Sequence, residues 1–236
     1  MNKNNTKHFS QTLKDFFKGY FPTKIICLGR NYLDHIKETN ANVPEEPVLF
    51  PKTLNCLIGD GDNIIYHRFL YEKEKYNRVD HEVELAVLIK DRCKNVKKEN
   101  AYDHILGYTI FNDITARKMQ RFDRSKNLPW YRSKSFDTFA PIGPKIVKHE
   151  EIGDPHNLKI ECKVNGEIKQ SSNTKHLLFK VPFLIEYISS HFTLEPGDII
   201  ATGTPSGISP LSPGDVIEAS IEKIGTLTNK VILESE

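Results

Sequence analysis

The sequence lacks the features of several classes of protein. Its apolar runs all fall short of the roughly 20 residues that cross a bilayer, so we expect no membrane-spanning segment. The 33 lysines and arginines nearly balance the 31 aspartates and glutamates, and a net charge of +2 is too small and too evenly spread for a nucleic-acid-binding surface. We therefore expect neither a membrane nor a nucleic acid as a partner.

Cysteine is also scarce. The four cysteines lie far apart, with no CxxC pair and no cysteine and histidine spacing that suits zinc: Cys27, Cys56, Cys93 and Cys162. We expect them to be reduced, mostly buried thiols of an intracellular protein. The cysteine pattern therefore favours a cytoplasmic location.

The N-terminal segment, residues 1–23, lacks the long apolar core of a secretory signal. It combines lysines with apolar residues in an amphipathic pattern: Lys3, Lys7, Lys14 and Lys18 with Phe9, Leu13, Phe16 and Phe17. We predict a helical extension over residues 1–23 that packs on a single catalytic domain, residues 24–236. A mitochondrial transit peptide is the alternative, which the absence of arginine and the low serine content disfavour.

Strand patterns dominate the rest of the chain. Alternating or β-branched runs predict strands over 24–28, 83–89, 107–115 and, as a hairpin around Asn165-Gly166, 159–170. The segments "EPGDIIAT" and "SPGDVIEA" near the end each combine a Pro-Gly turn with a strand. Helices are fewer and are predicted over 115–126 and 181–192. This pattern favours an α+β, strand-rich fold over a doubly wound sheet.

The segment from Tyr66 to Asp80, "YHRFLYEKEKYNRVD", interrupts the run of strands. It is highly charged, and charged segments without periodicity are usually solvated. We predict an exposed loop or a long hairpin arm.

Two glutamates in "HEVEL" indicate a metal site. Glu82 and Glu84 are two residues apart on a predicted strand, so both side chains leave the same face, about 6.6 Å apart at the backbone. Two carboxylates beside a core repel each other unless a cation lies between them. Oxygen ligands alone indicate Mg²⁺, with Mn²⁺ or Ca²⁺ as alternatives, rather than zinc. The competing interpretation is the solvated face of a two-faced strand.

Asp113 is a third candidate ligand. It lies in "IFNDITARKMQ", where an apolar strand ends and a helix begins. Capping of that helix is the competing interpretation. Together with Glu82 and Glu84 it would fill one side of an octahedral site and leave positions for water and substrate.

Six ordered segments resemble the fumarylacetoacetate hydrolase family, most closely its short single-domain branch of acylpyruvate hydrolases: "GRNYLDH", "HEVELAVLI", "NDITAR", "LPWYRSKSFDTFAPIGP", "VNGE" and "GDIIATGTPSGI". The resemblance runs from about Lys24 to about Ala219. It implies a mixed β-sandwich roll with a few peripheral helices, a homodimer, and Mg²⁺ or Mn²⁺ bound by Glu82, Glu84 and Asp113.

The resemblance also implies three catalytic residues, of which His35 and Glu38 would lie on a short lid. These two residues share a face of one helical turn, so Glu38 can orient the imidazole while its other nitrogen takes a proton from water. The matching family lysine, Lys134, would stabilise the pyruvate enolate that leaves. A surface helix with an incidental His and Glu pair is the competing interpretation.

Four further residues are candidates for substrate contacts. Gln120 matches a family glutamine that donates to the substrate, and Arg30 would bind a carboxylate or anchor the lid through an acid. Arg117 follows Asp113 by one turn and is also a candidate partner for the metal-binding acids. Thr204 lies on a Gly-flanked turn whose N–H groups can approach an anion. Lys52 lies where the family has Lys-Pro, but Thr53 follows it here and leaves its place open.

The predicted function is hydrolysis of the carbon–carbon bond of an acylpyruvate, a small keto acid. Relatives in the family also decarboxylate or tautomerise oxaloacetate, so these reactions are the first alternative. A non-catalytic protein that binds a metal or a ligand is the second alternative.

Overall fold

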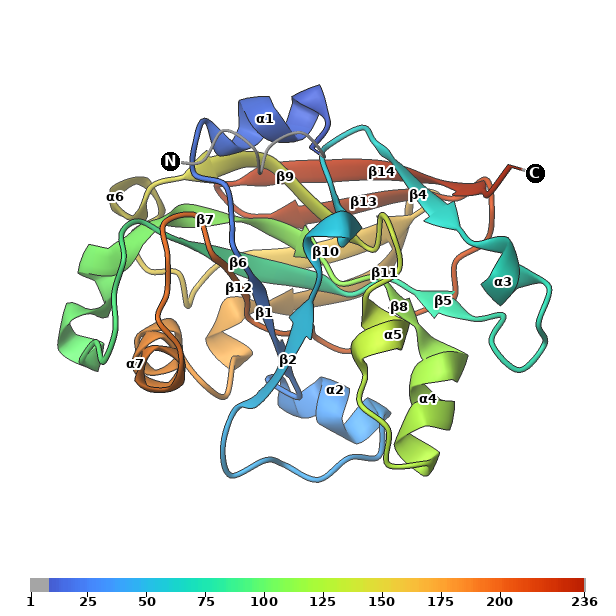
Figure 1. Ribbon diagram of the computed structural model, residues 1–236, viewed down its shortest axis with the longest axis horizontal. Coiled ribbons are helices and arrows are strands. Elements are labelled where there is room, and N and C mark those ends of the chain that lie inside the picture. Colours follow the sequence, from blue (N-terminus) through green and yellow to red (C-terminus); the bar gives the residue numbers. More distant parts are fainter. Residues whose placement is uncertain (1–8, 236) are drawn as a thin grey trace.

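Two β-sheets and a two-stranded ribbon form the framework of the computed structural model, which describes residues 9–235 (Figure 1). The seven-stranded sheet has the order β2 (Val48–Lys52), β1 (Ile25–Gly29), β12 (Ile199–Ala201), β6 (Val83–Ile89), β7 (Ile105–Asn112), β9 (Ala140–Val147) and β3 (Leu57–Ile58). The five-stranded sheet has the order β11 (Glu167–Asn173), β10 (Lys159–Val164), β13 (Val216–Ile221), β14 (Gly225–Leu233) and β4 (Asn63–Tyr66). The ribbon pairs β5 (Val79–Asp80) with β8 (Thr115–Ala116).

Helices are short and lie around the sheets (Figure 1). The α-helices are α1 (Gln11–Phe17), α2 (Leu33–Glu38), α3 (Arg68–Tyr71), α4 (Arg117–Ser125), α5 (Tyr131–Lys134), α6 (His149–Ile152) and α7 (Val181–His191). Three 3₁₀ turns complete the elements: η1 (Leu54–Cys56), η2 (Lys98–His104) and η3 (Thr174–His176). The predicted α+β, strand-rich fold is confirmed. No helix of the described residues is long and apolar enough to span a membrane.

The strand at 83–89 shows how the sequence pattern produces the core. All seven residues of β6 are buried, because the seven-stranded sheet is covered on one face by the five-stranded sheet and on the other by α1 and neighbouring loops. Leu85 and Val87 pack in the larger apolar cluster between the sheets, whereas Ala86 and Leu88 pack in the smaller cluster under α1. Alternate residues therefore enter different cores.

The directions of four strands place one end of each at the same edge of the large sheet. Strands β1 and β12 are parallel, β6 is antiparallel to β12, and β7 is antiparallel to β6. The C-terminal ends of β1, β12 and β7 therefore meet the N-terminal end of β6. Polar residues follow or precede each strand at this edge: Arg30, Thr202, Asp113 and Glu82.

The N-terminal helix packs on the large sheet. Phe9, Leu13 and Phe17 are buried in the smaller apolar cluster, and α1 contacts β9 and β3. Residues 1–8 of the predicted helical extension lie outside the described residues, and the division into an extension and one domain stays a prediction. All four cysteines are buried and free, as expected.

The prediction of an exposed loop for the segment from Tyr66 to Asp80 is wrong in part. The segment contains α3 and β5, and its apolar side chains Leu70, Tyr76 and Val79 are buried in the larger cluster. Its charged residues are mostly exposed, as expected. Tyr66 is also buried there, and these four apolar residues among many charges give too weak a period to be recognised in the sequence.

The two Pro-Gly turns provide a matched test of packing. Gly197 (φ +86°) and Gly214 (φ +102°) both have backbone angles that side chains rarely adopt. A Cβ at Gly197 would lie 2.1 Å from the Tyr20 carbonyl oxygen, whereas a Cβ at Gly214 would meet nothing within 4 Å. The turn at Gly197 therefore tolerates no side chain.

We expect Gly214→Ala to cost about 1–2 kcal/mol of unfolding free energy, from backbone strain alone. Gly197→Ala should cost at least about 1–3 kcal/mol more, because a backbone atom must also move. Urea unfolding of both variants measures the difference. Equal losses would show that the contact with Tyr20 contributes nothing.

Candidate functional site

Three buried carboxylates meet at the edge where the strand ends gather. One oxygen from each of Glu82, Glu84 and Asp113 lies within 4.8 Å of the others, and all three residues are buried. Two hydrogen bonds fix the backbone between them: the Asp113 N–H donates to the Glu82 carbonyl at 2.8 Å, and the Glu82 N–H donates to Asn112 Oδ1 at 2.9 Å. The structure thus brings together the three acids that the sequence predicted as ligands.

Three cations surround two of these acids. Lys134 Nζ donates to Glu82 Oε2 at 2.9 Å and also to Asp113, while Lys52 Nζ lies 2.7 Å from Asp113 Oδ1. Arg117 donates to Glu82 from the other side. Burial disfavours the Glu82 carboxylate, but the charges of Lys134 and Arg117 outweigh burial and lower its pKa. Glu82 is therefore held as an anion.

Glu84 differs from its two neighbours because no cation compensates it. Its Oε2 accepts a hydrogen bond from the Gly203 N–H at 2.7 Å, and in the described chain no basic side chain lies within ion-pair distance of it. Burial, followed by the charges of Asp113 and Glu82, raises its pKa well above the ordinary value. A buried carboxylate beside two anions fits a site for one more cation, and oxygen ligands suit Mg²⁺ or Mn²⁺.

The helix α2 places His35 at the pocket. His35 Nδ1 lies 2.9 Å from Glu38 Oε2, which is the contact that the three-residue spacing predicted. Glu38 Oε1 in turn accepts from the Gly207 N–H at 3.0 Å, and Asp34 accepts from the Ser206 hydroxyl at 2.9 Å. The helix is therefore docked on the loop that follows β12.

Arg117 and Gln120 are neighbours on α4. Arg117 donates through Nε to Asp80 Oδ2 at 2.9 Å and through one terminal nitrogen to Gln120 Oε1 at 2.6 Å. Arg78 also contacts Asp80, at 2.8 Å. These bonds occupy Arg117 with protein acceptors and leave the amide N–H₂ of Gln120 as its free donor.

Thr204 is bonded within the protein. Its Oγ1 donates to the Val83 carbonyl at 2.9 Å and accepts from Gln170 Nε2 at 2.8 Å. The backbone angle of Gly203 is φ +96°, as the turn requires, and its N–H is the one that donates to Glu84. This turn therefore orients a candidate metal ligand.

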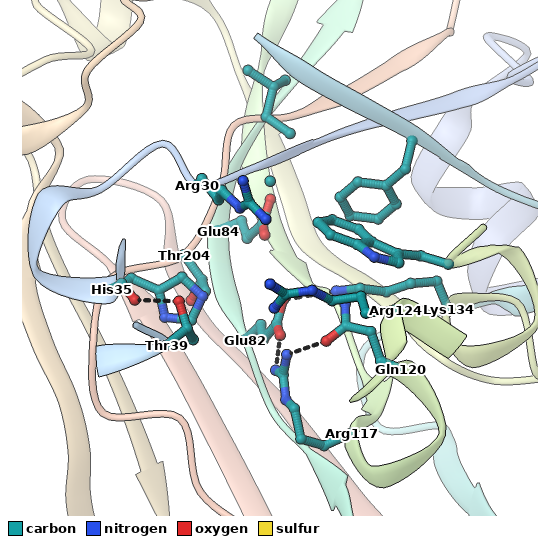
Figure 2. A pocket seen from close by; sticks show the side chains of 14 residues that line it. Arg30, His35, Thr39, Glu82, Glu84, Arg117, Gln120, Arg124, Lys134 and Thr204 are labelled. Atoms are coloured by element: carbon teal, nitrogen blue, oxygen red, sulfur yellow. Dashed lines mark hydrogen bonds and ion pairs between the residues drawn. The ribbon is translucent and has the colours of Figure 1, made fainter. Parts of the chain in front are cut away.

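A pocket of about 40 Å³ lies among these residues. Figure 2 shows Glu82 and Glu84 between His35 on one side and Lys134 with Gln120 on the other. Residues that were not predicted line part of this pocket. Eight predicted site residues also line it: Arg30, His35, Glu82, Glu84, Arg117, Gln120, Lys134 and Thr204. Asp113 and Glu38 do not line the pocket but form ion pairs with residues that do, Lys134 and His35 respectively.

Sequence reasoning missed several supporting residues. Asp80 was assigned to an exposed loop, yet it is buried against Arg117. Lys52, whose place was left open, is the buried partner of Asp113. Arg124, one turn beyond Gln120, also lines the pocket; its helical spacing from Arg117 was the available signal.

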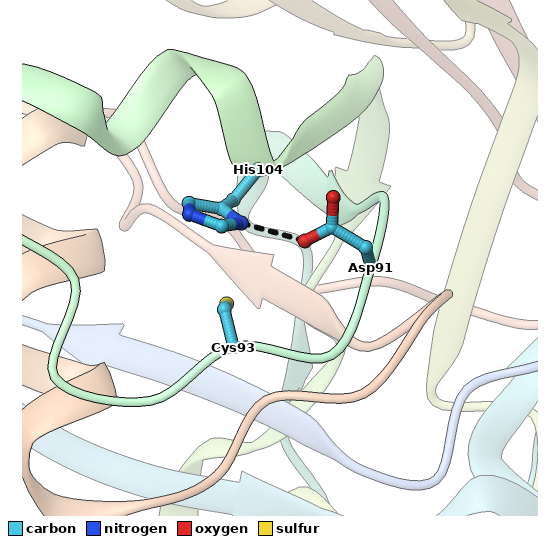
Figure 3. A group of neighbouring side chains, drawn as sticks. All are labelled: Asp91, Cys93 and His104. Carbon is cyan, nitrogen blue, oxygen red and sulfur yellow. Dashed lines mark hydrogen bonds and ion pairs between the residues drawn. The ribbon is translucent and has the colours of Figure 1, made fainter.

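A second group of possible ligands lies elsewhere and has a different chemistry. Asp91, Cys93 and His104 offer atoms within 4.8 Å of one another (Figure 3). His104 Nδ1 and Asp91 Oδ1 are already paired at 2.6 Å. Burial, followed by the charge of Asp91, raises the pKa of the Cys93 thiol to about 11. Hard cations such as Mg²⁺ should therefore prefer the three carboxylates.

Comparisons with known proteins found similar sequences over most of the chain. A profile of the family described as fumarylacetoacetate (FAA) hydrolase, C-terminal, matches residues 24–232. An uncharacterised protein of Pyrococcus abyssi is 54% identical over 222 residues, which cover 93% of this chain and 96% of that protein. A mitochondrial oxaloacetate tautomerase of Bos taurus is 44% identical over 218 residues, which cover 89% of this chain and 67% of that protein.

A solved structure gives the same result at the level of the fold. The fumarylpyruvate hydrolase of Pseudomonas aeruginosa, described in complex with Mn²⁺ and pyruvate, superposes with a TM-score of 0.82 at 29% identity. The superposition covers 90% of this chain and 91% of that one. The strand order described above therefore belongs to a fold with known members.

Replacing Glu84 tests the metal site. Manganese at 100 times its dissociation constant should stabilise the wild type by about 2.7 kcal/mol. Glu84→Gln should lose this stabilisation, because it removes the uncompensated carboxylate, whereas His104→Ala in the second group should keep it. Thermal unfolding with and without Mn²⁺ measures both. Stabilisation that survives in Glu84→Gln but not in His104→Ala would place the ion at the second group.

The raised pKa of Glu84 predicts a pH dependence in the metal-free protein. A carboxyl whose pKa is raised in the folded state stabilises the fold below its ordinary pKa, near 4.5, and this contribution is lost as the pH rises toward the folded-state value. Relative to Glu84→Gln, the unfolding free energy of the wild type should therefore fall by up to about 1.4 kcal/mol for each pH unit above the ordinary pKa. Urea unfolding in chelator across the pH range measures the difference, and a constant difference would contradict the prediction.

Proposed function

The chain belongs to the fumarylacetoacetate hydrolase family, and from this premise we propose that it is a metal-dependent enzyme that cleaves the carbon–carbon bond of acylpyruvates. The observation that carries the proposal is the buried cluster of Glu82, Glu84 and Asp113, in which Glu84 has no cation of its own, beside the paired His35 and Glu38. A cation site and a general base in one pocket are what hydrolysis of a 1,3-diketo acid requires.

The metal would be held by Glu82, Glu84 and Asp113, whose donors are all carboxylate oxygens. When bound, Mg²⁺ or Mn²⁺ supplies Lewis-acid polarisation of the substrate's oxygen atoms. The protein's own contribution is to hold two of these carboxylates in place. Lys52 and Lys134 do this for Asp113 through ion pairs, and Lys134 and Arg117 do it for Glu82.

His35 is the proposed general base. Its Nδ1 hydrogen bonds to Glu38, so the proton of the neutral imidazole resides on Nδ1 and leaves Nε2 as the acceptor for a proton of water. Glu38 is itself fixed by the Gly207 N–H, which limits rotation of the pair. The water activated in this way would attack the distal acyl carbonyl of the substrate.

Lys134 is the proposed stabiliser of the leaving enolate. An ammonium group has three N–H donors, and Glu82 and Asp113 accept two of them. Burial disfavours the charged amine, but Asp113 and Glu82 outweigh burial and raise the pKa of Lys134. The group therefore stays positive, and its third N–H is available to the negative oxygen that forms when the carbon–carbon bond breaks.

Oxaloacetate tautomerisation or decarboxylation is the second candidate function. The observation that favours it is the 44% identity to the bovine oxaloacetate tautomerase. The same cation site and Lys134 would stabilise the enolate of oxaloacetate, and decarboxylation needs no attacking water. The homodimer and the cytoplasmic or mitochondrial location stay predictions.

Release of pyruvate from acetylpyruvate in the presence of Mg²⁺ tests the proposal. His35→Ala should lower this hydrolysis by about 10²–10⁴-fold, because general-base catalysis contributes that much. His191→Ala, at an exposed histidine of α7, serves as the matched control and should retain activity. Decarboxylation of oxaloacetate should be far less sensitive to His35.

Two results would count against the hydrolase. Turnover of oxaloacetate without cleavage of acetylpyruvate favours the second candidate. Binding of Mg²⁺ with no turnover of either keto acid favours a non-catalytic protein.

A further inference from the structure

Two arginines of the pocket form no ion pair with the described residues of the protein. Figure 2 shows Arg30, from the segment after β1, and Arg124, from α4, entering the pocket from two sides. Among the described residues, no carboxylate lies within ion-pair distance of either guanidinium. The other pocket cations, Lys134 and Arg117, are each paired with acids.

Both arginines lack an acid for identifiable reasons. The acid next to Arg124 in sequence, Asp123, is buried and accepts from Arg132 at 3.0 Å. The lid acids near Arg30 are also occupied: Asp34 by the Ser206 hydroxyl and Glu38 by His35 and the Gly207 N–H. The alternative of Arg30 as an anchor of the lid through an acid is therefore not what the structure shows.

The guanidinium group of Arg124 lies close enough to disfavour the charge of Arg30. Burial, followed by the charge of Arg124, lowers the pKa of Arg30. An arginine does not lose its proton in a protein, so the repulsion persists until an anion binds between the groups.

The backbone of Arg30 is fixed in a costly conformation. Its φ of +60° is left-handed, a conformation that a residue with a side chain rarely adopts. The next residue, Asn31, fixes this conformation through the Thr202 carbonyl at 2.8 Å and the Phe179 N–H at 2.7 Å. Strain of this kind is concentrated at ligand sites, and here it directs the guanidinium to the pocket.

Arg124 is positioned by helical spacing. Arg117, Gln120 and Arg124 follow one another at three and four residues, so they share one face of α4. Gln120 and Arg117 lie beside Glu82, and Arg124 lies one turn further from the acids. The face thus runs from the carboxylate cluster outward along the pocket.

We propose that Arg30 and Arg124 bind a second carboxylate of the substrate, so that the site takes dicarboxylic 2-oxo acids in preference to those with an uncharged tail. The inference rests on the proposed function, because it places the 2-oxo acid end of the substrate at Glu82, Glu84 and Asp113. Guanidinium groups bind carboxylates through paired hydrogen bonds, which are stronger than hydrogen bonds between neutral groups. An uncharged tail would leave both arginines without a counter-ion.

Unreactive ligands test the subsite separately from the reaction. 2-Oxoglutarate and 2-oxopentanoate have the same length and differ in a terminal carboxylate or methyl group. Calorimetry with the Mn²⁺-loaded protein should show at least about tenfold tighter binding of 2-oxoglutarate, since one charged hydrogen bond contributes that much. 2-Oxoadipate and 2-oxohexanoate give the same comparison at six carbons.

Arg30→Met and Arg124→Met should each lower this preference by about tenfold, and Arg124→Lys should restore part of it. Arg121→Met is the matched control, because Arg121 is exposed on the same helix and does not line the pocket. It should keep the preference. A preference that persists in both methionine variants, or its absence at both chain lengths in the wild type, overturns the subsite. Absence of acylpyruvate or oxaloacetate turnover bears on the proposed function alone.

Discussion

The burial of three carboxylates within one small volume is the constraint on which the site depends. Glu82, Glu84 and Asp113 lie within 4.8 Å of one another, out of water. Unpaired charges in such surroundings are strongly disfavoured, so the fold must supply positive charge. Two lysines and one arginine compensate Glu82 and Asp113, and Glu84 is left for a cation that the protein does not itself provide.

This constraint is met by the way the strands run. The sheet places the start of β6 beside the end of β7, so two glutamates and Asp113 meet across one strand pairing. The compensating cations come from other parts of the chain, β2 for Lys52 and α5 for Lys134. The loop after β12 completes the arrangement, because its Gly203 N–H donates to Glu84 and its Gly207 N–H donates to Glu38. One loop thus positions a candidate metal ligand and the partner of His35.

The basic residues of the pocket divide into two groups with different physical roles. Lys52, Lys134 and Arg117 are buried in ion pairs and hold neighbouring carboxylates in place. Arg30 and Arg124 have no acid within ion-pair distance in the described chain and are more exposed. A charge that is already compensated contributes little to recognition of an anion, whereas an uncompensated charge at the pocket is available to a ligand. The proposed selection of dicarboxylic substrates therefore rests on the second group.

The sequence by itself determined the strand-rich fold, the three candidate ligands and the contact of His35 with Glu38. These features depend on periods of two residues in a strand and three or four in a helix, which can be read locally. Tertiary structure decided which cation faces which acid. Asp80, in a segment predicted to be exposed, is buried against Arg117, and Lys52 contacts Asp113 across 61 residues of chain. Such pairs carry no local period, because strand order and direction alone bring them together.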